Sequence, residues 1–270
     1  MGKVFEALYG SDNASSKTPE PVQQETTKVV ETVTETVTET VVEEVAGTRP
    51  KLDNLVTALP EGFSGNAKWR RDMRKVAINL MVQVDPEERG GKTVMFTSMA
   101  SRVGTSTVTA QIAKIFAAEY VKHRVLVIDV KTGSNSAVNT LDKALDDGYS
   151  VADIIDACEP EGVSRISVYA PDDQVRSTKV AHYLREFFAQ ANEYFDWILV
   201  DMPPIGVTPL GDTVGRSVDG VSLVVSTVGT TRIPALNAIE DDMSQLGINL
   251  IGVILNFRKY PIPSFLLKYL

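Results

Sequence analysis

The residues with the clearest potential for chemistry form a polar loop at residues 97–107, with the sequence T-S-M-A-S-R-V-G-T-S-T. An apolar, strand-like segment precedes this loop and a helix-like segment follows it, as in a phosphate-binding loop of the form G-x-x-x-x-G-K-[ST]. Gly104 and Ser106 match that form, whereas Met99 stands at the first glycine and Thr105 at the lysine. The loop alone also fits an ordinary strand-to-helix turn capped by Ser or Thr.

The loop keeps several groups that could contact a nucleotide. Backbone N–H groups at residues 102–106 could surround phosphate oxygens at the start of a helix. The Ser106 hydroxyl could bind Mg²⁺, and the Thr107 hydroxyl could bond the α-phosphate. Without the lysine charge, we expect ATP or ADP with Mg²⁺ to bind weakly and to turn over slowly. The predicted nucleotide contacts in the loop are Arg102, Val103, Gly104, Thr105, Ser106 and Thr107.

Two aspartates follow apolar, strand-like runs elsewhere in the chain. Asp129 ends the run at residues 125–129, and Asp201 ends the run at residues 195–201, before two prolines. In open α/β sheets, ligands bind beside the carboxyl ends of the strands. Carboxylates in that position can hold Mg²⁺ or order a water molecule. We therefore predict that Asp129 and Asp201 are catalytic residues and that, with Ser106, they would be the metal ligands.

Alternating strand and helix patterns position these residues. Helical patterns separate apolar strands predicted at about residues 93–98, 124–129, 166–169, 196–201, 221–226 and 249–255. An amphipathic helix is predicted at residues 69–84. Nearly continuous apolar strands indicate burial on both faces of a parallel sheet. The sequence predicts an α/β fold, with a doubly wound, mostly parallel sheet flanked by helices.

The N-terminal part of the chain has a different composition. Residues 1–10 form a short helical patch, which could pack locally or dock onto a partner. Residues 11–64 are acidic and rich in Thr, Val and Glu, so we predict a disordered linker. Valines at every fourth position between residues 29 and 45 leave open a helix that forms on a partner. Residues 65–270 are predicted to form the folded domain.

Composition narrows the possible functions. A net charge of −8 argues against general nucleic-acid binding. The single cysteine, Cys158, excludes an intramolecular disulfide and fits a cytoplasmic location, where it is predicted to be a small core residue. No apolar run approaches the length needed to span a bilayer. The apolar segment at residues 262–270 could fold onto the domain or contact a membrane protein.

Together these motifs resemble the tyrosine kinases of bacterial capsule and exopolysaccharide systems, which are related to MinD/ParA-type P-loop ATPases. The resemblance covers about residues 66–270 and includes the run V-L-V-I-D at residues 125–129. It also includes D-W-I-L-V-D-M-P-P at residues 196–204 and G-I-N-L-I-G-V-I-L-N at residues 247–256. The resemblance implies a P-loop NTPase fold and an Asn256 that contacts the adenine. Arg71 and Arg74 match two arginines of an assembly motif, which implies a possible homo-oligomer.

The departures from the family fall at residues that act in catalysis. Thr105 replaces the P-loop lysine, and Lys131 stands where a second aspartate is expected. The C-terminus offers Tyr260 and Tyr269 in place of the tyrosine cluster that active members autophosphorylate. We expect a catalytically impaired regulator of exopolysaccharide or capsule biosynthesis or export. It would lie at the inner face of the cytoplasmic membrane, through an inner-membrane co-polymerase or export protein.

Two alternatives remain open from the sequence. The first is an active ATP-dependent tyrosine autokinase or ATPase with an atypical loop, in which Arg102 replaces the lysine. The second is a positioning ATPase of the MinD/ParA type, which the C-terminal motifs disfavour. Binding of ATP would distinguish the impaired regulator from the active enzyme.

Overall fold

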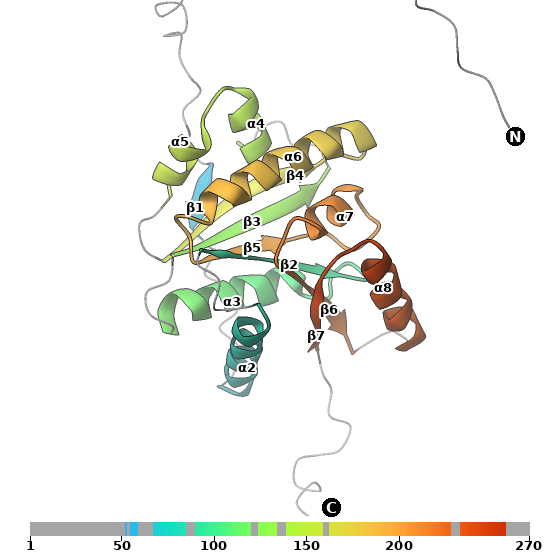
Figure 1. Cartoon of the computed structure of the whole chain (residues 1–270). Helices are drawn as coiled ribbons and strands as arrows, with labels where there is room; N and C mark the ends of the chain where they lie inside the picture. The colour runs from blue at the N-terminus through green and yellow to red at the C-terminus, as the bar shows by residue number, and fades with distance from the viewer. Residues whose placement is uncertain are drawn as a thin grey trace, which may run out of the picture. The chain divides into compact units, whose positions relative to one another are not determined.

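The computed structural model describes residues 52, 55–58, 67–84, 90–119, 124–133, 139–158, 162–227 and 233–257. Within these residues, seven strands form one sheet in the order β1-β4-β3-β5-β2-β6-β7. β1 is antiparallel to β4, and the other neighbouring strands are parallel. The predicted α/β fold with a mostly parallel sheet is therefore confirmed (Figure 1). The strands are β1 (Val56–Ala58), β2 (Lys92–Ser98), β3 (Arg124–Thr132), β4 (Gly162–Ala170), β5 (Trp197–Asp201), β6 (Gly220–Ser226) and β7 (Leu250–Asn256).

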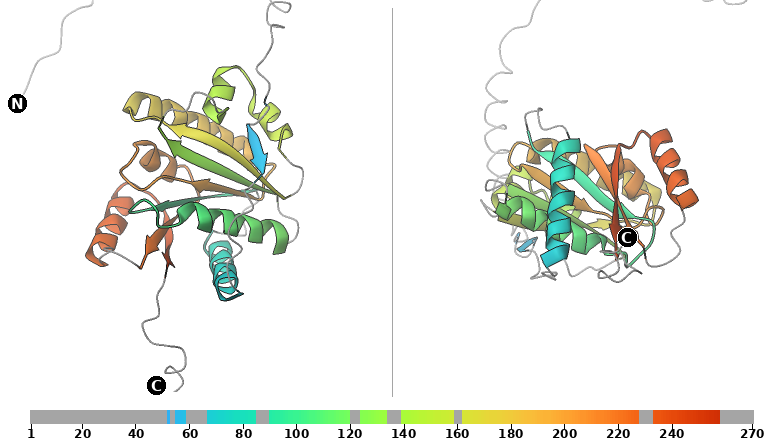
Figure 2. Two further views of the ribbon diagram at one scale, coloured as in Figure 1. Left: turned by 180° about the vertical axis from the view of Figure 1, so that it is seen from behind. Right: turned by 90° about the horizontal axis from the view of Figure 1, so that it is seen from below.

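Helices cover both faces of the sheet (Figure 1, Figure 2). One face carries α2 (Ala67–Gln83) and α3 (Thr105–Glu119), and the other carries the remaining helices. This arrangement explains why β2 and β5 are buried along their whole length, since each strand packs against helices on both sides. The helices of the second face are α4 (Leu141–Asp146), α5 (Val151–Asp156), α6 (Gln174–Ala191), α7 (Leu210–Gly215) and α8 (Ile233–Gln245).

α3 packs closely against the sheet, and the polar loop leads directly into its first turn. Its predicted apolar face is fully buried, and the Phe116 ring stacks on Trp197 of β5 with ring centroids 4.4 Å apart. Stacked aromatic pairs contribute more than their buried area alone. The packing therefore holds α3 in place against β5. It also limits the positions available to the polar loop that joins β2 to α3. The buried residues of this face are Val108, Ile112, Ile115 and Phe116.

β1 was not found by the sequence analysis. It lies inside the segment 11–64 that was predicted to be a linker, and it pairs with β4 through Val56 and Ile166. Leu55, beside it, is only 2% exposed and belongs to the core of the second face. Residues 1–51, including most of the predicted linker and the patch at residues 1–10, lie outside the described residues.

Cys158 has the predicted role of a small core residue. It is buried at the end of α5, and its thiol donates a hydrogen bond to the Ile154 carbonyl. Burial raises the pKa of this thiol to about 11, so the reactive thiolate is scarce at neutral pH. None of the described helices combines the length and the apolar character that crossing a membrane requires.

Candidate functional site

The loop between β2 and α3 has the strand–loop–helix geometry predicted for a phosphate-binding loop. It spans residues 99–104, from the end of β2 at Ser98 to the start of α3 at Thr105. Arg102 and Gly104 both have positive φ, 61° and 89°. Successive turns of this kind direct backbone N–H groups toward one point, as in anion-binding nests. The loop therefore contains two residues in the left-handed backbone region that such nests use.

Gly104 is required by its surroundings as well as by its backbone. A Cβ at this position would lie 2.4 Å from the side-chain nitrogen of Asn256. That nitrogen donates a 2.9 Å hydrogen bond to the Val103 carbonyl, and the Asn256 side-chain oxygen accepts from the N–H of Phe257. The end of β7 thus lies directly against the loop. Both Asn256 groups named here have partners inside the protein.

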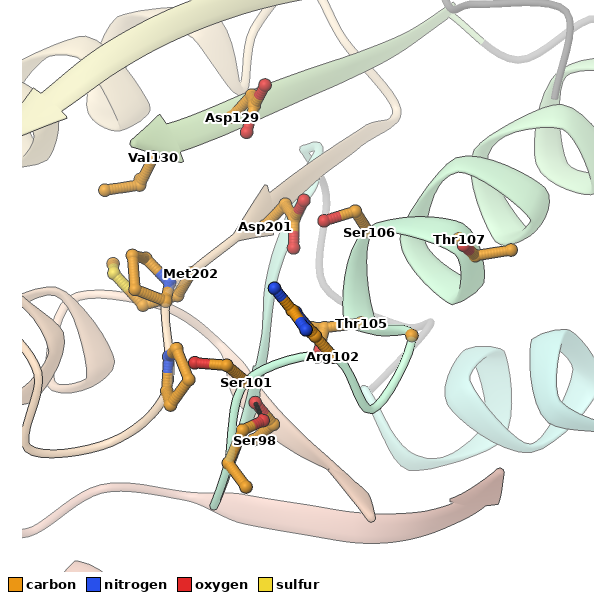
Figure 3. Close-up of a pocket in the computed structure, with 14 residues that line it drawn as sticks. Ser98, Ser101, Arg102, Thr105, Ser106, Thr107, Asp129, Val130, Asp201 and Met202 are labelled. Carbon is orange, nitrogen blue, oxygen red and sulfur yellow. Dashed lines mark hydrogen bonds between the residues drawn. The ribbon is translucent and has the colours of Figure 1, made fainter. Parts of the chain in front are cut away.

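A pocket of about 310 Å³ opens beside the loop, at the carboxyl ends of β2, β3 and β5 (Figure 3). The Ser106 hydroxyl points toward Asp201, while Arg102 points into the pocket. Among the described residues that line it, Arg102 is the one cationic side chain. The lining residues are Ser98, Ala100, Ser101, Arg102, Gly104, Thr105, Ser106, Thr107, Asp129, Val130, Asp201, Met202, Pro203 and Pro204.

Most of the predicted site residues meet in this pocket. Arg102, Gly104, Thr105, Ser106, Thr107, Asp129 and Asp201 all line it. Val103 and Asn256 do not line it: the Val103 side chain is buried in the core below α3, and its carbonyl bonds Asn256. The predicted contact between Asn256 and an adenine stays a prediction.

Asp129 and Asp201 lie directly opposite each other on adjacent parallel strands. Each is only 8% exposed. β5 ends at Asp201, before the prolines, as the sequence predicts. β3 instead continues past its predicted end to Thr132, because its last residues still pair with β4. Asp129 therefore lies within a strand and not at its end.

The Asp201 carboxyl is affected strongly by this position. Burial, together with the charge of Asp129, raises the pKa of Asp201 to a net value of about 6. A hydrogen bond from Ser106 and the positive charge of Arg165 act in the opposite direction. Perturbed carboxyl groups in a pocket are candidates for functional sites.

Two cations contact Asp129, and the sequence analysis missed one of them. The guanidinium of Arg165, on β4, donates a hydrogen bond to Asp129 Oδ2. Lys131 Nζ lies 3.6 Å from the same oxygen. A charged residue inside the otherwise apolar run V-S-R-I-S-V at residues 163–168 was the available signal for Arg165.

These contacts bear on whether the predicted ligands fit a magnesium ion. Mg²⁺ requires a near-octahedral set of oxygen ligands and usually takes one or two carboxylates. Here one oxygen of Asp129 is already occupied by two cationic donors, and the Ser106 hydroxyl is hydrogen-bonded to Asp201. As arranged, Asp129 does not fit the role of a metal ligand.

Arg71 and Arg74 are exposed on α2 and are not among the residues that line the pocket. Their predicted role in a homo-oligomer stays a prediction, because the structure contains one chain.

Comparisons with known proteins agree with the fold and with the resemblance. No protein-family model matches the chain. The chain is 27% identical over 191 residues to the tyrosine-protein kinase CpsD of Streptococcus agalactiae, and the match covers 67% of this chain and 79% of CpsD. It is 34% identical over 73 residues to the tyrosine-protein kinase Etk of Escherichia coli K12. That second match covers 27% of this chain and 10% of Etk.

The chain is thus similar in sequence to bacterial proteins named tyrosine-protein kinases. Solved structures agree on the fold of the kinase domain. The Etk kinase domain of Escherichia coli superimposes with a TM-score of 0.59 at 21% identity, covering 79% of this chain and 89% of that domain. The BceF tyrosine kinase domain superimposes with a TM-score of 0.52 at 22% identity, covering 82% and 88% of the two chains. P-loop proteins generally bind nucleotide with Mg²⁺ at the loop that here lines the pocket.

Proposed function

We propose that this protein is a P-loop-fold regulator of exopolysaccharide or capsule biosynthesis or export, and that its catalytic capacity is impaired. The observation that carries the proposal is Thr105, the first residue of α3, at the position of the P-loop lysine. Its neutral side chain lines the pocket beside Ser106. The backbone of a phosphate site is thus retained, whereas its principal charge is missing.

The missing lysine should weaken nucleotide binding and affect turnover more strongly. Loss of one charge-assisted contact costs roughly 1.5–3 kcal/mol, or about 10- to 100-fold in affinity. The lysine of a P-loop also stabilises charge that develops during phosphoryl transfer. An interaction that is stronger in the transition state contributes more to turnover than to binding. ATP or ADP would therefore bind weakly, with little catalysis.

The partner in this proposal is an inner-membrane polysaccharide co-polymerase or export protein. The kinase names of the relatives and the resemblance to capsule and exopolysaccharide kinases support this choice. Contact with such a partner would place the protein in the cytoplasm, at the inner face of the membrane. Arg71 and Arg74 would contact a second copy of the chain. The net charge of −8 supports a role without nucleic acid.

An active ATP-dependent autokinase or ATPase is the second candidate. The observation that favours it is the Arg102 side chain, which lines the pocket from the loop itself. A guanidinium can bind phosphate oxygens through two donors. Arg102 would then supply the positive charge that Thr105 lacks.

Autophosphorylation distinguishes the impaired regulator from an active autokinase, and release of phosphate from ATP in the same samples distinguishes it from an active ATPase. The purified protein is incubated with ATP–Mg²⁺ and assayed for phosphotyrosine, with Asp201→Ala as the control. The impaired regulator gives no phosphotyrosine in either sample. Phosphotyrosine that forms in the wild-type protein and is lost in Asp201→Ala and in Arg102→Ala would establish the active enzyme instead.

A further inference from the structure

The acidic pair of the pocket presents an electrostatic problem that the fold must solve. Asp129 and Asp201 are directly opposite on adjacent strands, and both are almost completely buried. Like charges in that arrangement are unfavourable, and burial in a low-dielectric interior increases the repulsion. In a metal-dependent P-loop site, the divalent ion compensates the carboxylates. A site that lacks this compensation needs positive charge from the chain itself.

Arg165 brings such a charge from the neighbouring strand. The register pairs Arg165 with Val127, two residues before Asp129 and on the same face of the sheet. The long side chain then reaches along the strand to Asp129 Oδ2, where it forms an ion pair. Lys131 lies two residues after Asp129 and approaches the same oxygen. Both cations thus contact Asp129, and the charge of Arg165 also acts on Asp201 from a greater distance. The formal charges of the two carboxylates and the two cations sum to zero.

We propose that Arg165, assisted by Lys131, is a built-in counter-cation of the Asp129–Asp201 pair, so that the pocket receives phosphate groups without a divalent metal. The geometry of the carboxylate pair disfavours a divalent metal by itself, whereas binding of phosphate at this pocket rests on the function proposed above. The ligand would be the metal-free nucleotide.

The chemistry of the donors favours this arrangement over a metal site. A guanidinium stays charged under all physiological conditions, so it does not leave Asp129 by losing a proton. A divalent ion entering the pocket would meet carboxylates whose negative charge Arg165 and Lys131 already offset. It would also be repelled by the positive charge of Arg102, which lines the pocket. It would also have to replace the hydrogen bond between Ser106 and Asp201. With the carboxylates compensated by Arg165 and Lys131, the positive charge of Arg102 is left to attract the phosphates of a free nucleotide.

Direct metal binding tests the proposal without any nucleotide. Mn²⁺, a paramagnetic substitute for Mg²⁺, is titrated into the full-length protein, and the bound fraction is measured by electron paramagnetic resonance. The wild-type protein should hold no Mn²⁺ in the pocket at millimolar concentration. Arg165→Gln frees the carboxylates and should tighten Mn²⁺ binding by about tenfold or more. Arg165→Lys keeps the charge and should exclude the ion as the wild-type protein does.

A matched control removes a similar arginine outside the pocket. Arg176 forms a surface ion pair with Asp173 on α6, so Arg176→Gln should leave Mn²⁺ binding unchanged. Tight Mn²⁺ binding by the wild-type protein that is lost in Asp129→Asn would overturn the proposal. This arm uses the wild-type fold, so it decides the question even if Arg165→Gln does not fold.

A nucleotide titration then separates this inference from the proposed function. ATP affinity is measured by calorimetry in excess EDTA and in excess Mg²⁺. The proposal expects equal or tighter binding in EDTA for the wild-type protein, and tighter binding with Mg²⁺ for Arg165→Gln. ATP binding by the wild-type protein that requires Mg²⁺ would refute the counter-cation proposal. Absence of ATP binding in both conditions would instead refute nucleotide binding in the proposed function, while the Mn²⁺ results would still decide the role of Arg165.

Discussion

The side-chain amide of Asn256 donates a 2.9 Å hydrogen bond to the backbone carbonyl of Val103. This bond joins the end of β7 to the loop before α3, across 153 positions of the sequence. A loop of this length would otherwise sample several backbone conformations. The bond therefore helps to maintain the loop shape that a phosphate group requires.

Removing this amide should loosen the loop. Asn256→Ala should lower the free energy of unfolding by about 1 kcal/mol, the usual contribution of one hydrogen bond. Amide hydrogen exchange at residues 99–104 should accelerate at the same time. Asn249→Ala is the matched control, since Asn249 donates a comparable bond to the Asp219 carbonyl, outside the lining of the pocket. Equal acceleration of loop exchange in both variants would contradict a specific role for Asn256.

Two glycines with the same backbone angle allow a second test. Gly104 and Gly133 both have φ of 89°, but a Cβ meets the Asn256 side chain at Gly104 and nothing within 4 Å at Gly133. Each change to alanine should cost about 1 kcal/mol for the backbone conformation. Gly104→Ala should cost a further 1–3 kcal/mol, approximately, for the steric overlap. Chemical denaturation measures both, and equal losses would show that the close contact is unimportant.

Leu55 lies before the predicted boundary of the folded domain at residue 65 and is buried in the core, so we expect it to contribute to the stability of that domain. Leu55→Ala removes a side chain that is 2% exposed, and should cost about 2–4 kcal/mol. Leu255→Ala, on the edge strand β7 and 55% exposed, should cost less than about 1 kcal/mol. Thermal or chemical denaturation gives both values. Equally small losses of unfolding free energy in both variants would agree with the predicted start of the folded domain at residue 65.

The sequence predicted the strands of the sheet well, because a buried parallel strand is nearly continuous in apolar residues. It also predicted that Asp129 and Asp201 would meet, because strand ends in such a sheet gather at one edge. β1 was missed because three residues beside an acidic segment carry too little periodicity. Arg165 was missed because its ion pair with Asp129 depends on the register between β3 and β4, which a single strand pattern does not reveal.

The raised pKa of Asp201 predicts a pH-dependent stability. Its folded-state value of about 6 lies above the ordinary 3.8, so the folded protein binds the proton more tightly than the unfolded chain. Above pH 6 the ionised Asp201 carboxylate therefore lowers the free energy of unfolding. This destabilisation disappears as the pH falls from about 6 toward 3.8, because the folded protein takes up the proton first. Asp201→Asn should stabilise the protein at pH 7 by on the order of 2 kcal/mol, and by little at pH 4.

A second aspartate with the opposite shift serves as the control. The hydrogen bond from Lys179, followed by that from Tyr183, lowers the pKa of Asp146. Asp146→Asn should therefore reduce stability at pH 7, and the reduction should vanish as the pH falls below the ordinary value of 3.8. A lower free energy of unfolding for Asp201→Asn at pH 7 would contradict the claim that the buried Asp201 charge destabilises the folded protein.

Restoring the missing lysine tests the central claim most directly. The affinity for ATP is measured by calorimetry for the wild-type protein and for Thr105→Lys under identical conditions. If the loop retains its shape and lacks only this charge, Thr105→Lys should bind ATP about 10- to 100-fold more tightly. Equally tight binding by the two proteins, with phosphoryl transfer already present in the wild type, would contradict the account of an impaired site.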